Sequence, residues 1–424
     1  MRLLLHKLGW QVASNVGVAL IAGAYVLYLG ANLGAGQFGL FALILAIPTF
    51  AFAAADLRIQ EATARFLVQQ SEASRCAAYL RHFWRIDVLS RVVVLVVLAV
   101  ATPLMLVYLL RGNAGWQIVL TAIVGMFLGK VANSAAVGVL RARDQFVWHA
   151  RLLLLSWAIK LAVTVVIVQF LGGGVQAAIT ISVVVDALAN LATIARARQA
   201  ARAEQWMVPG DAARLGLEER RQLRHFLTSN FGISASDSVL KELDTALVGV
   251  LLNLESVGLY RMGKNIVQMI WRVVDPVYIL MMPEFSRQLA AGNDAAVHRL
   301  GRIITLTTFG VVSVIAIVMI ATLPYIVPLV LGPSFAGLTI VCAVMVTGVL
   351  LGGPLIWVHA AWIAEGRPDR QLIANVCGAV LAASAYLVLV PRYSVRGAAI
   401  AFAVSLSVPF LLSRLLWHNH SIRK

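Results

Sequence analysis

The chain has 424 residues, of which 60% are hydrophobic and 13% charged, and its formal net charge is +16. Because soluble domains carry about 25% charged residues, this composition excludes a water-soluble enzyme and a disordered or fibrous protein. The basic residues fall mainly between apolar stretches, which is the pattern that sets membrane topology. The positive charge therefore does not point to nucleic-acid binding.

Twelve apolar stretches follow one another along the chain. A helix needs about 20 apolar residues to cross the bilayer, and we expect the first stretch to stay uncleaved because no convincing A-x-A site follows it. The predicted spans are residues 9–31, 37–56, 87–110, 115–140, 150–171, 175–195, 226–252, 257–282, 302–331, 336–363, 371–391 and 397–417. The sequence thus predicts an all-α polytopic membrane protein.

Two longer polar segments lie between these spans. Residues 57–86 carry Ile59, Ala62 and Phe66 at helical spacing, which predicts an amphipathic helix at the membrane surface. Residues 196–225 hold seven arginines and form the predicted linker between two halves. The expected domains are an N-terminal lobe (1–195), a cytoplasmic linker (196–225) and a C-terminal lobe (226–424).

The basic residues also predict the orientation of the chain. With the N-terminus in the cytoplasm, the inside segments together with the span ends that adjoin them hold 25 Lys and Arg residues, and the outside segments hold three. Because cytoplasmic loops are enriched in basic residues, we expect an even number of spans with both termini inside.

The two halves share a weak internal repeat. Phe38-Gly39-Leu40-Phe41 aligns with Val257-Gly258-Leu259-Tyr260 at an offset of 219 residues, and Gly30 meets Gly249 at the same offset. Each half holds an even number of predicted spans, so both have the same orientation. We therefore predict two six-helix lobes related by an axis along the membrane normal.

Charged residues inside the spans are the main candidates for function, since each costs about 2.5–3.5 kcal/mol at mid-helix on insertion scales. Most must face protein or water. One face of the seventh span carries Asn230, Ser234, Asp237, Lys241 and Asp244, and one face of the eighth carries Arg261, Lys264, Gln268, Arg272 and Asp275. The other candidates are Asn15 in the first span, Asp56 and Arg58 at the end of the second, and Lys130, Lys160 and Asp186 as isolated charges in spans four to six.

Two interpretations of these polar faces stay open. The functional one is a water-filled cavity lined by spans one, two, seven and eight. The structural one is internal pairing within the helices, with Lys241 bound to Asp237 or Asp244 and Arg272 bound to Asp275.

Enzyme motifs give no competing site. Gly34 to Gly39 matches G-x-G-x-x-G, but that motif needs a soluble βαβ unit and here it lies in the external turn between two spans. The three cysteines are far apart in sequence, so we expect no disulfide framework, no metal site and no cofactor.

Three segments resemble a known family. They are Asp56-Leu57-Arg58-Ile59-Gln60-Glu61, the run from Leu243-Asp244-Thr245 to Glu255-Ser256-Val257-Gly258-Leu259-Tyr260-Arg261, and Pro283-Glu284-Phe285-Ser286-Arg287. The chain resembles the bacterial polysaccharide-export or O-antigen flippase (Wzx-type) proteins of the multidrug/oligosaccharidyl-lipid/polysaccharide (MOP) exporter superfamily. The resemblance implies a MATE-like fold with two six-helix lobes around a central cavity, and alternating access without ATP hydrolysis.

The resemblance also implies a substrate and residue roles. The substrate would be a polyprenyl-diphosphate-linked oligosaccharide, moved from the cytoplasmic to the outer leaflet of the bacterial inner membrane. Partners would be membrane lipid, a proton or sodium ion and polysaccharide assembly proteins, with the transporter a monomer. Anion contacts would be Arg58, Lys241, Arg261, Lys264 and Arg272; coupling or ion-pair partners would be Asp56, Asp186, Asp237, Asp244 and Asp275; further cavity residues would be Asn15, Lys130, Lys160, Asn230 and Gln268.

Two other functions compete with this one. A cation-coupled multidrug antiporter of the same fold would need a cavity dominated by acidic and aromatic groups. A membrane-embedded glycan polymerase or glycosyltransferase would need a reactive site outside the bilayer, and the predicted external loops are only a few residues long.

Overall fold

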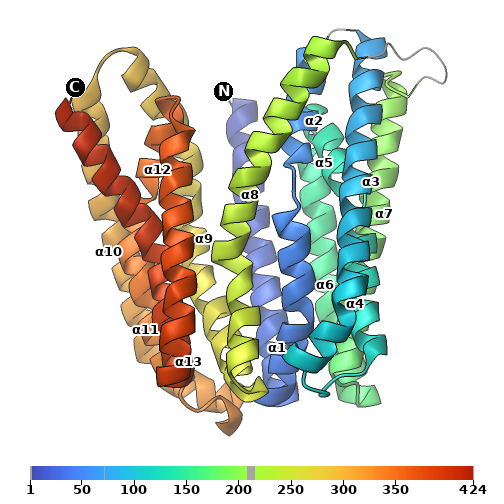
Figure 1. Ribbon diagram of the computed structural model, residues 1–424, viewed down its shortest axis with the longest axis vertical. Coiled ribbons are helices and arrows are strands. Elements are labelled where there is room, and N and C mark those ends of the chain that lie inside the picture. The colour runs from blue at the N-terminus through green and yellow to red at the C-terminus, as the bar shows by residue number, and fades with distance from the viewer. Residues whose placement is uncertain (1, 71, 208–214, 424) are drawn as a thin grey trace. The chain divides into compact units, whose positions relative to one another are not determined.

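The computed structural model describes residues 2–70, 72–207 and 215–423, which form helices joined by short turns (Figure 1). Helices satisfy every backbone hydrogen bond within one segment, which is what a chain inside hydrocarbon requires. In this part of the chain, eight helical stretches are long and apolar enough to cross a membrane. The protein is therefore a multi-pass membrane protein, as predicted.

Two of these eight stretches each contain two predicted spans. Val16–Gln69 and Asp369–His418 include kinks at Gly34 and Ser394, whose φ values are 72° and 53°, and two helices follow each other directly at each kink. The predicted spans 226–252 and 257–282 are not among the eight found in the described residues. Both contain side chains that lie outside the described residues, so these two spans stay predictions.

The described residues cluster into two compact units. Unit 1 consists of Met1–Tyr25 with Ile44–Ser238, and unit 2 consists of Val26–Leu43 with Val239–Lys424. The division into residues 1–195, 196–225 and 226–424 stays a prediction. Helices extend into the predicted linker from both sides, since one continues to Ala203 and the next begins at Leu217.

Unit 1 contains broken helices where the sequence predicted continuous spans. The predicted span 115–140 is two helices, separated at residues 131–132. The elements are α1 (Arg2–Ala54, shared with unit 2), α2 (Ile59–Gln69), α3 (Ala73–Leu104), a π-helical turn η1 (Met105–Leu109), α4 (Trp116–Lys130), α5 (Asn133–Ala142), α6 (Phe146–Leu171), α7 (Val175–Ala203) and the first part of α8 (Leu217–Leu251).

The structure corrects the prediction of an amphipathic helix at the membrane surface. Ile59, Ala62 and Phe66 do form one face of α2, but that face is buried in a cluster with Phe83 of α3 and Leu140 of α5. The apolar face thus packs against protein rather than resting on the membrane surface. In addition, α3 begins at Ala73, well before the predicted start of the third span at residue 87. Residues 73–86 of the polar segment therefore belong to the same helix as the apolar span.

Unit 2 repeats irregular features of unit 1. The π-helical turns η1 (Met105–Leu109) and η2 (Val327–Leu331) both end a long helix, which supports the predicted repeat. The remaining elements are α9 (Leu254–Ala290), α10 (Asp294–Ile326), a 3-10 turn η3 (Pro333–Phe335), α11 (Leu338–Gly352), a 3-10 turn η4 (Gly353–Leu355), α12 (Ile356–Ala364) and α13 (Pro368–Arg423).

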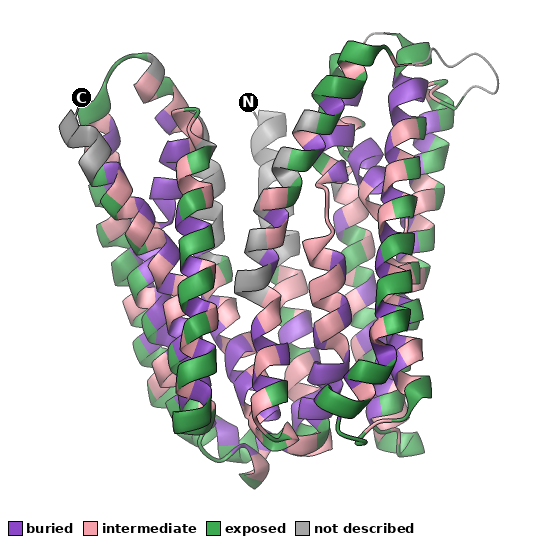
Figure 2. Ribbon diagram, viewed as in Figure 1, coloured by how far each residue is buried: buried purple, intermediate pink, exposed green. Residues whose placement is uncertain are grey.

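Over residues 89–104 of α3 and 309–318 of α10, the exposed side chains are apolar, as contact with lipid requires. On α3, Val93, Val97 and Val100 are 60%, 58% and 74% exposed, one helical turn apart (Figure 2). On α10, Val314 and Ile317 are exposed in the same way. These faces follow the 3.6-residue period and indicate which sides of the two helices meet the bilayer.

Gly348 of α11 packs directly against the backbone of α13. A Cβ at residue 348 would lie 2.6 Å from Ala403 Cα, so Gly348→Ala must push the helices apart. We expect it to cost about 1–3 kcal/mol of stability, seen as a lower melting temperature in detergent. Gly310→Ala on α10 is the matched control, because a Cβ there meets nothing within 4 Å. Equal melting of the two variants would contradict this packing.

Candidate functional site

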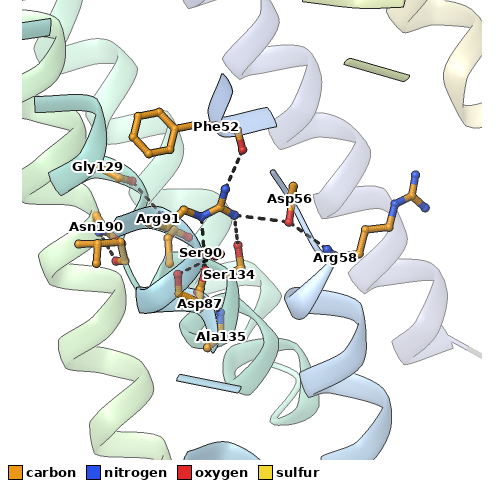
Figure 3. A network of polar contacts seen from close by, with 12 residues as sticks. Phe52, Asp56, Arg58, Asp87, Ser90, Arg91, Gly129, Ser134, Ala135 and Asn190 are labelled. Carbon is orange, nitrogen blue, oxygen red and sulfur yellow. Dashed lines mark hydrogen bonds and ion pairs between the residues drawn. The ribbon is translucent and has the colours of Figure 1, made fainter. Parts of the chain in front are cut away.

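Arg91 of α3 lies at the centre of a polar network in unit 1 (Figure 3). Its side chain is only 3% exposed, and its Nε lies 3.4 Å from Oδ1 of Asp87, one turn earlier on the same helix. Its Nη1 donates to the carbonyl of Phe52 at 2.7 Å, and its Nη2 donates to Asp56 at 3.4 Å and to Ser134 at 3.2 Å. One guanidinium therefore holds α3, the end of α1 and the start of α5.

Both helix breaks of unit 1 meet this network. Between α1 and α2, Asp56 accepts from the backbone N–H of Arg58 at 3.0 Å, and Arg58 itself has a left-handed φ of 49°. Between α4 and α5, Ala132 has a φ of 57°, and Asp87 accepts from the N–H of Ala135 at 2.9 Å. Left-handed backbone at non-glycine residues is strained and persists only where surrounding contacts hold it.

The carbonyls released by the second break are also satisfied. Asn190 of α7 donates to the carbonyls of Leu128 at 2.7 Å and Val131 at 2.9 Å. Lys130, in the last turn of α4, is exposed and complements the negative end of that helix. Irregular backbone at membrane depth is tolerated where such partners exist, and in transporters broken helices frequently build the binding site.

A second ion pair of unit 1 joins Lys160 of α6 to Asp186 of α7. Their Nζ and Oδ1 atoms are 2.6 Å apart, with side-chain exposures of 6% and 51%. The Lys160 ammonium also lies 4.5 Å from the ring centre of Trp157, and Tyr25 hydrogen-bonds Ser182 at 2.6 Å close by. The two residues that sequence spacing treated as isolated charges therefore neutralise each other.

Asp244 of α8 lies at the centre of the corresponding network in unit 2. Its Oδ1 accepts from the Lys264 ammonium of α9 at 2.8 Å and from Thr245, and its Oδ2 accepts from Tyr260 at 2.5 Å. The Tyr260 and Tyr386 hydroxyls are 2.8 Å apart, which adds α13. Asp244 and Lys264 are each 1% exposed, so the carboxylate is paired and closed off from solvent.

The remaining predicted residues have different surroundings. Arg58 is half-buried and donates from Nε to Ser234 at 3.2 Å, whereas Arg261 is half-buried and donates to Thr245 at 3.2 Å. Arg272 is exposed and Gln268 half-buried on α9. The side chains of Asn15, Asn230, Asp237, Lys241 and Asp275 lie outside the described residues, so their predicted pairings stay predictions.

Among the described residues, Lys264 differs most from its expected role. A buried ammonium bound to Asp244 presents no surface to a large anion. For Asp244 we considered pairing with Lys241 on the same helix. In the structure, Asp244 pairs with Lys264 of the next helix, α9. Asp87 and Arg91 were not predicted at all. The available signal was their i, i+4 spacing at the start of an otherwise apolar span.

Comparisons with known proteins agree with this architecture. A sequence profile of the polysaccharide biosynthesis protein family matches residues 33–340, more than half of the chain. No curated protein matches the sequence.

Several solved structures share this fold. One is an inward-facing multidrug resistance MATE family transporter of the MOP superfamily, with TM-score 0.72 and 14% identity, covering 96% of this chain and 94% of that one. Another is the lipid II flippase MurJ in an inward closed conformation, with TM-score 0.71 and 10% identity over 96% and 87%. A MOP superfamily transporter from Pyrococcus furiosus has TM-score 0.62 and 15% identity over 98% and 95%. These likenesses confirm the predicted MATE-like fold.

Replacing Arg91 by methionine tests whether its network holds unit 1 together. The change leaves Asp87 buried without its ion pair and the Phe52 carbonyl without its donor. Loss of one partner of a buried pair costs about 3–5 kcal/mol, so we expect a large fall in melting temperature. The exposed Arg81 on the same helix gives the control Arg81→Met, which we expect to melt like the unmodified protein. Similar melting of both variants would contradict the account.

Proposed function

We propose that this chain, which belongs to the polysaccharide biosynthesis protein family, is a flippase for a polyprenyl-diphosphate-linked oligosaccharide. It would move this lipid from the cytoplasmic to the outer leaflet for surface polysaccharide biosynthesis, with no enzymatic step. The proposed location is the bacterial cytoplasmic membrane, with both termini inside because basic residues concentrate in the segments assigned there.

The burial and pairing of the charged side chains favour an anionic substrate. The carboxylate of Asp244 is buried against Lys264, and that of Asp87 is buried against Arg91. By contrast, Arg272 is exposed. These two buried carboxylates are thus already neutralised by the protein while a basic group keeps exposed surface, which suits a diphosphate better than a cationic drug.

The proposed mechanism uses arginine geometry. A guanidinium binds phosphate oxygens through two parallel charge-assisted hydrogen bonds. Arg58, held at the break before α2, and Arg261 and Arg272 on α9 would bind the diphosphate. The sugars would pass through a polar cavity while the isoprenoid chain stays in lipid.

Asp244 is the residue that we propose for energy coupling. Its carboxylate accepts from Lys264 and Tyr260 of α9 and from Thr245 of α8. The Tyr260 hydroxyl in turn bonds that of Tyr386, which links α13 to the network. Protonation of Asp244 would remove the charge that holds Lys264, so it would alter the packing of all three helices. A proton taken up there could therefore bias one conformation over another.

A cation-coupled multidrug antiporter is the second candidate, and its support is the fold shared with a multidrug resistance transporter. It would require acidic groups facing the substrate. Asp186, with 51% side-chain exposure, is the described residue that speaks for it, but Lys160 neutralises that carboxylate.

Charge reversal at Arg272 tests the anion site. We expect Arg272→Glu to reduce surface glycan by at least about tenfold when it replaces the native gene, because a carboxylate repels the diphosphate. Arg392→Glu is the control, since Arg392 is also exposed but lies on a different helix, near the kink of α13. Both variants are first checked for equal amounts in the membrane. Full export by Arg272→Glu would remove Arg272 from the site.

A double substitution separates coupling from stability at Asp244. Asp244→Asn leaves the Lys264 ammonium buried without its anion, so we expect a loss of about 3–5 kcal/mol. Adding Lys264→Met removes that ammonium and should restore most of the melting temperature, while glycan export stays low because no proton can bind at residue 244. Recovery of export together with stability would assign the pair a structural role alone.

A further inference from the structure

Two glycines of unit 2 bring backbones into direct contact. Gly39 lies on the segment Val26–Leu43 of α1 and Gly258 lies on α9. A Cβ on Gly39 would overlap the carbonyl oxygen of Leu254 and lie 2.9 Å from the carbonyl carbon of that residue. A Cβ on Gly258 would overlap the carbonyl oxygen of Ala35 and lie 2.8 Å from its carbonyl carbon. Only glycine fits at either position.

A second pair of contacts has the same form. Gly30 of the α1 segment packs against the end of the Met262 side chain, and Gly249 of α8 packs against Leu43. Each glycine of one segment thus faces a residue of the other segment, in both directions.

These contacts are related by the internal repeat. Adding the repeat offset of 219 converts Gly39 into Gly258 and Ala35 into Leu254, so the contact from Gly39 to Leu254 becomes the contact from Gly258 to Ala35. The same offset converts the contact of Gly30 with Met262 into that of Gly249 with Leu43. Such reciprocity is the property of an isologous interface around a two-fold axis. The segments 30–43 and 249–262 therefore form a self-complementary seam.

The seam lies beside the turns at Gly34 and at residues 252–253, which we predict to be external. Other parts of unit 2 close over it: the Ser334 hydroxyl accepts from the N–H of Ala35 at 3.4 Å, and the rings of Phe38 and Phe335 are 6.3 Å apart. A side chain added at Gly36, in contrast, would meet nothing within 4 Å. The close packing is therefore confined to one face of the α1 segment.

We propose that Gly39 and Gly258 are transport residues, because their seam is the external closure that must separate each time the glycan is released outside. Glycine at both positions lets the two repeats meet backbone to backbone without interlocking side chains, so the closed seam is tight and can still part. This inference rests on the proposed alternating-access function and names the contact that alternates.

A disulfide across the seam tests whether it must open. In a chain with Cys76, Cys342 and Cys377 replaced by serine, we would combine Leu43→Cys with Gly249→Cys. A Cβ at residue 249 lies 3.2 Å from Leu43 Cγ, which is near the Cβ-to-sulfur separation across a disulfide. Oxidation in membranes should form the bond and lower glycan export by at least about tenfold, and a reductant should restore it. The single-cysteine variants should be insensitive to oxidant.

Two results would overturn the proposal. Failure of the pair to crosslink would contradict the contact, and undiminished export by the crosslinked protein would show that the seam need not open. Crosslinking needs no substrate, so it tests the contact independently of the proposed function. If the unmodified chain exports no glycan, that result refutes the proposed function and leaves the contact untouched.

Matched glycine variants supply an independent measurement in the same assay. Gly39→Ala, added to the cysteine pair, should lower the yield of crosslinked protein several-fold, because its Cβ pushes the seam apart. Gly36→Ala, on the open face of the same segment, should leave the yield unchanged. Equal yields for the two variants, at equal amounts of inserted protein, would contradict the role of Gly39.

Discussion

An ionised side chain at membrane depth must be neutralised by protein or reached by water, and the structure follows from this requirement. The described buried Lys and Arg side chains each meet a carboxylate from another segment: Arg91 meets Asp56 at the end of α1, Lys160 meets Asp186 of α7, and Lys264 meets Asp244 of α8. A pair between helices fixes how those helices pack, in addition to removing charge. The networks of Arg91 and Asp244 therefore act as the internal supports of the two units.

Ion pairing also divides the charged side chains into two kinds. The paired, buried side chains support the fold, and the exposed ones remain accessible to a substrate. Lys264 is bound inside unit 2, whereas Arg272, two turns further along α9, is exposed. In unit 1, the Arg91 network supports the strained backbone of Arg58. Function in this account belongs to the arginines at the edge of the networks, and the buried pairs hold them in place.

Hydropathy predicted the membrane spans because a bilayer accepts few structures other than helices. It did not predict the break between α4 and α5, since the apolar run continues through Val131 and Ala132 and the helix-end residues beside them, Lys130 and Asn133, are weak signals. That break is stabilised by Asp87 and Asn190, which lie far away in sequence. Sequence spacing likewise grouped Asp244 with Lys264 on adjacent faces but could not give their contact, because side-chain distances between helices depend on packing.

The internal repeat was visible in the sequence as a few matched residues, and its meaning comes from contacts. Gly39 and Gly258 align at the repeat offset, but only the structure places each of them against the backbone of the opposite repeat. Matched glycines in a hydrophobic sequence are weak signals by themselves. They become informative when the contacts that they make are exchanged by the same offset.

The most direct test of the account is a leaflet assay with the purified protein in vesicles that contain a polyprenyl-diphosphate-linked oligosaccharide and no ATP. A glycan-modifying enzyme added outside reports how much of the lipid becomes accessible. The account predicts that the inner pool reaches the enzyme when the protein and an ion gradient are present. An inner pool that stays protected, in vesicles where the same protein transports a cationic dye, would contradict it.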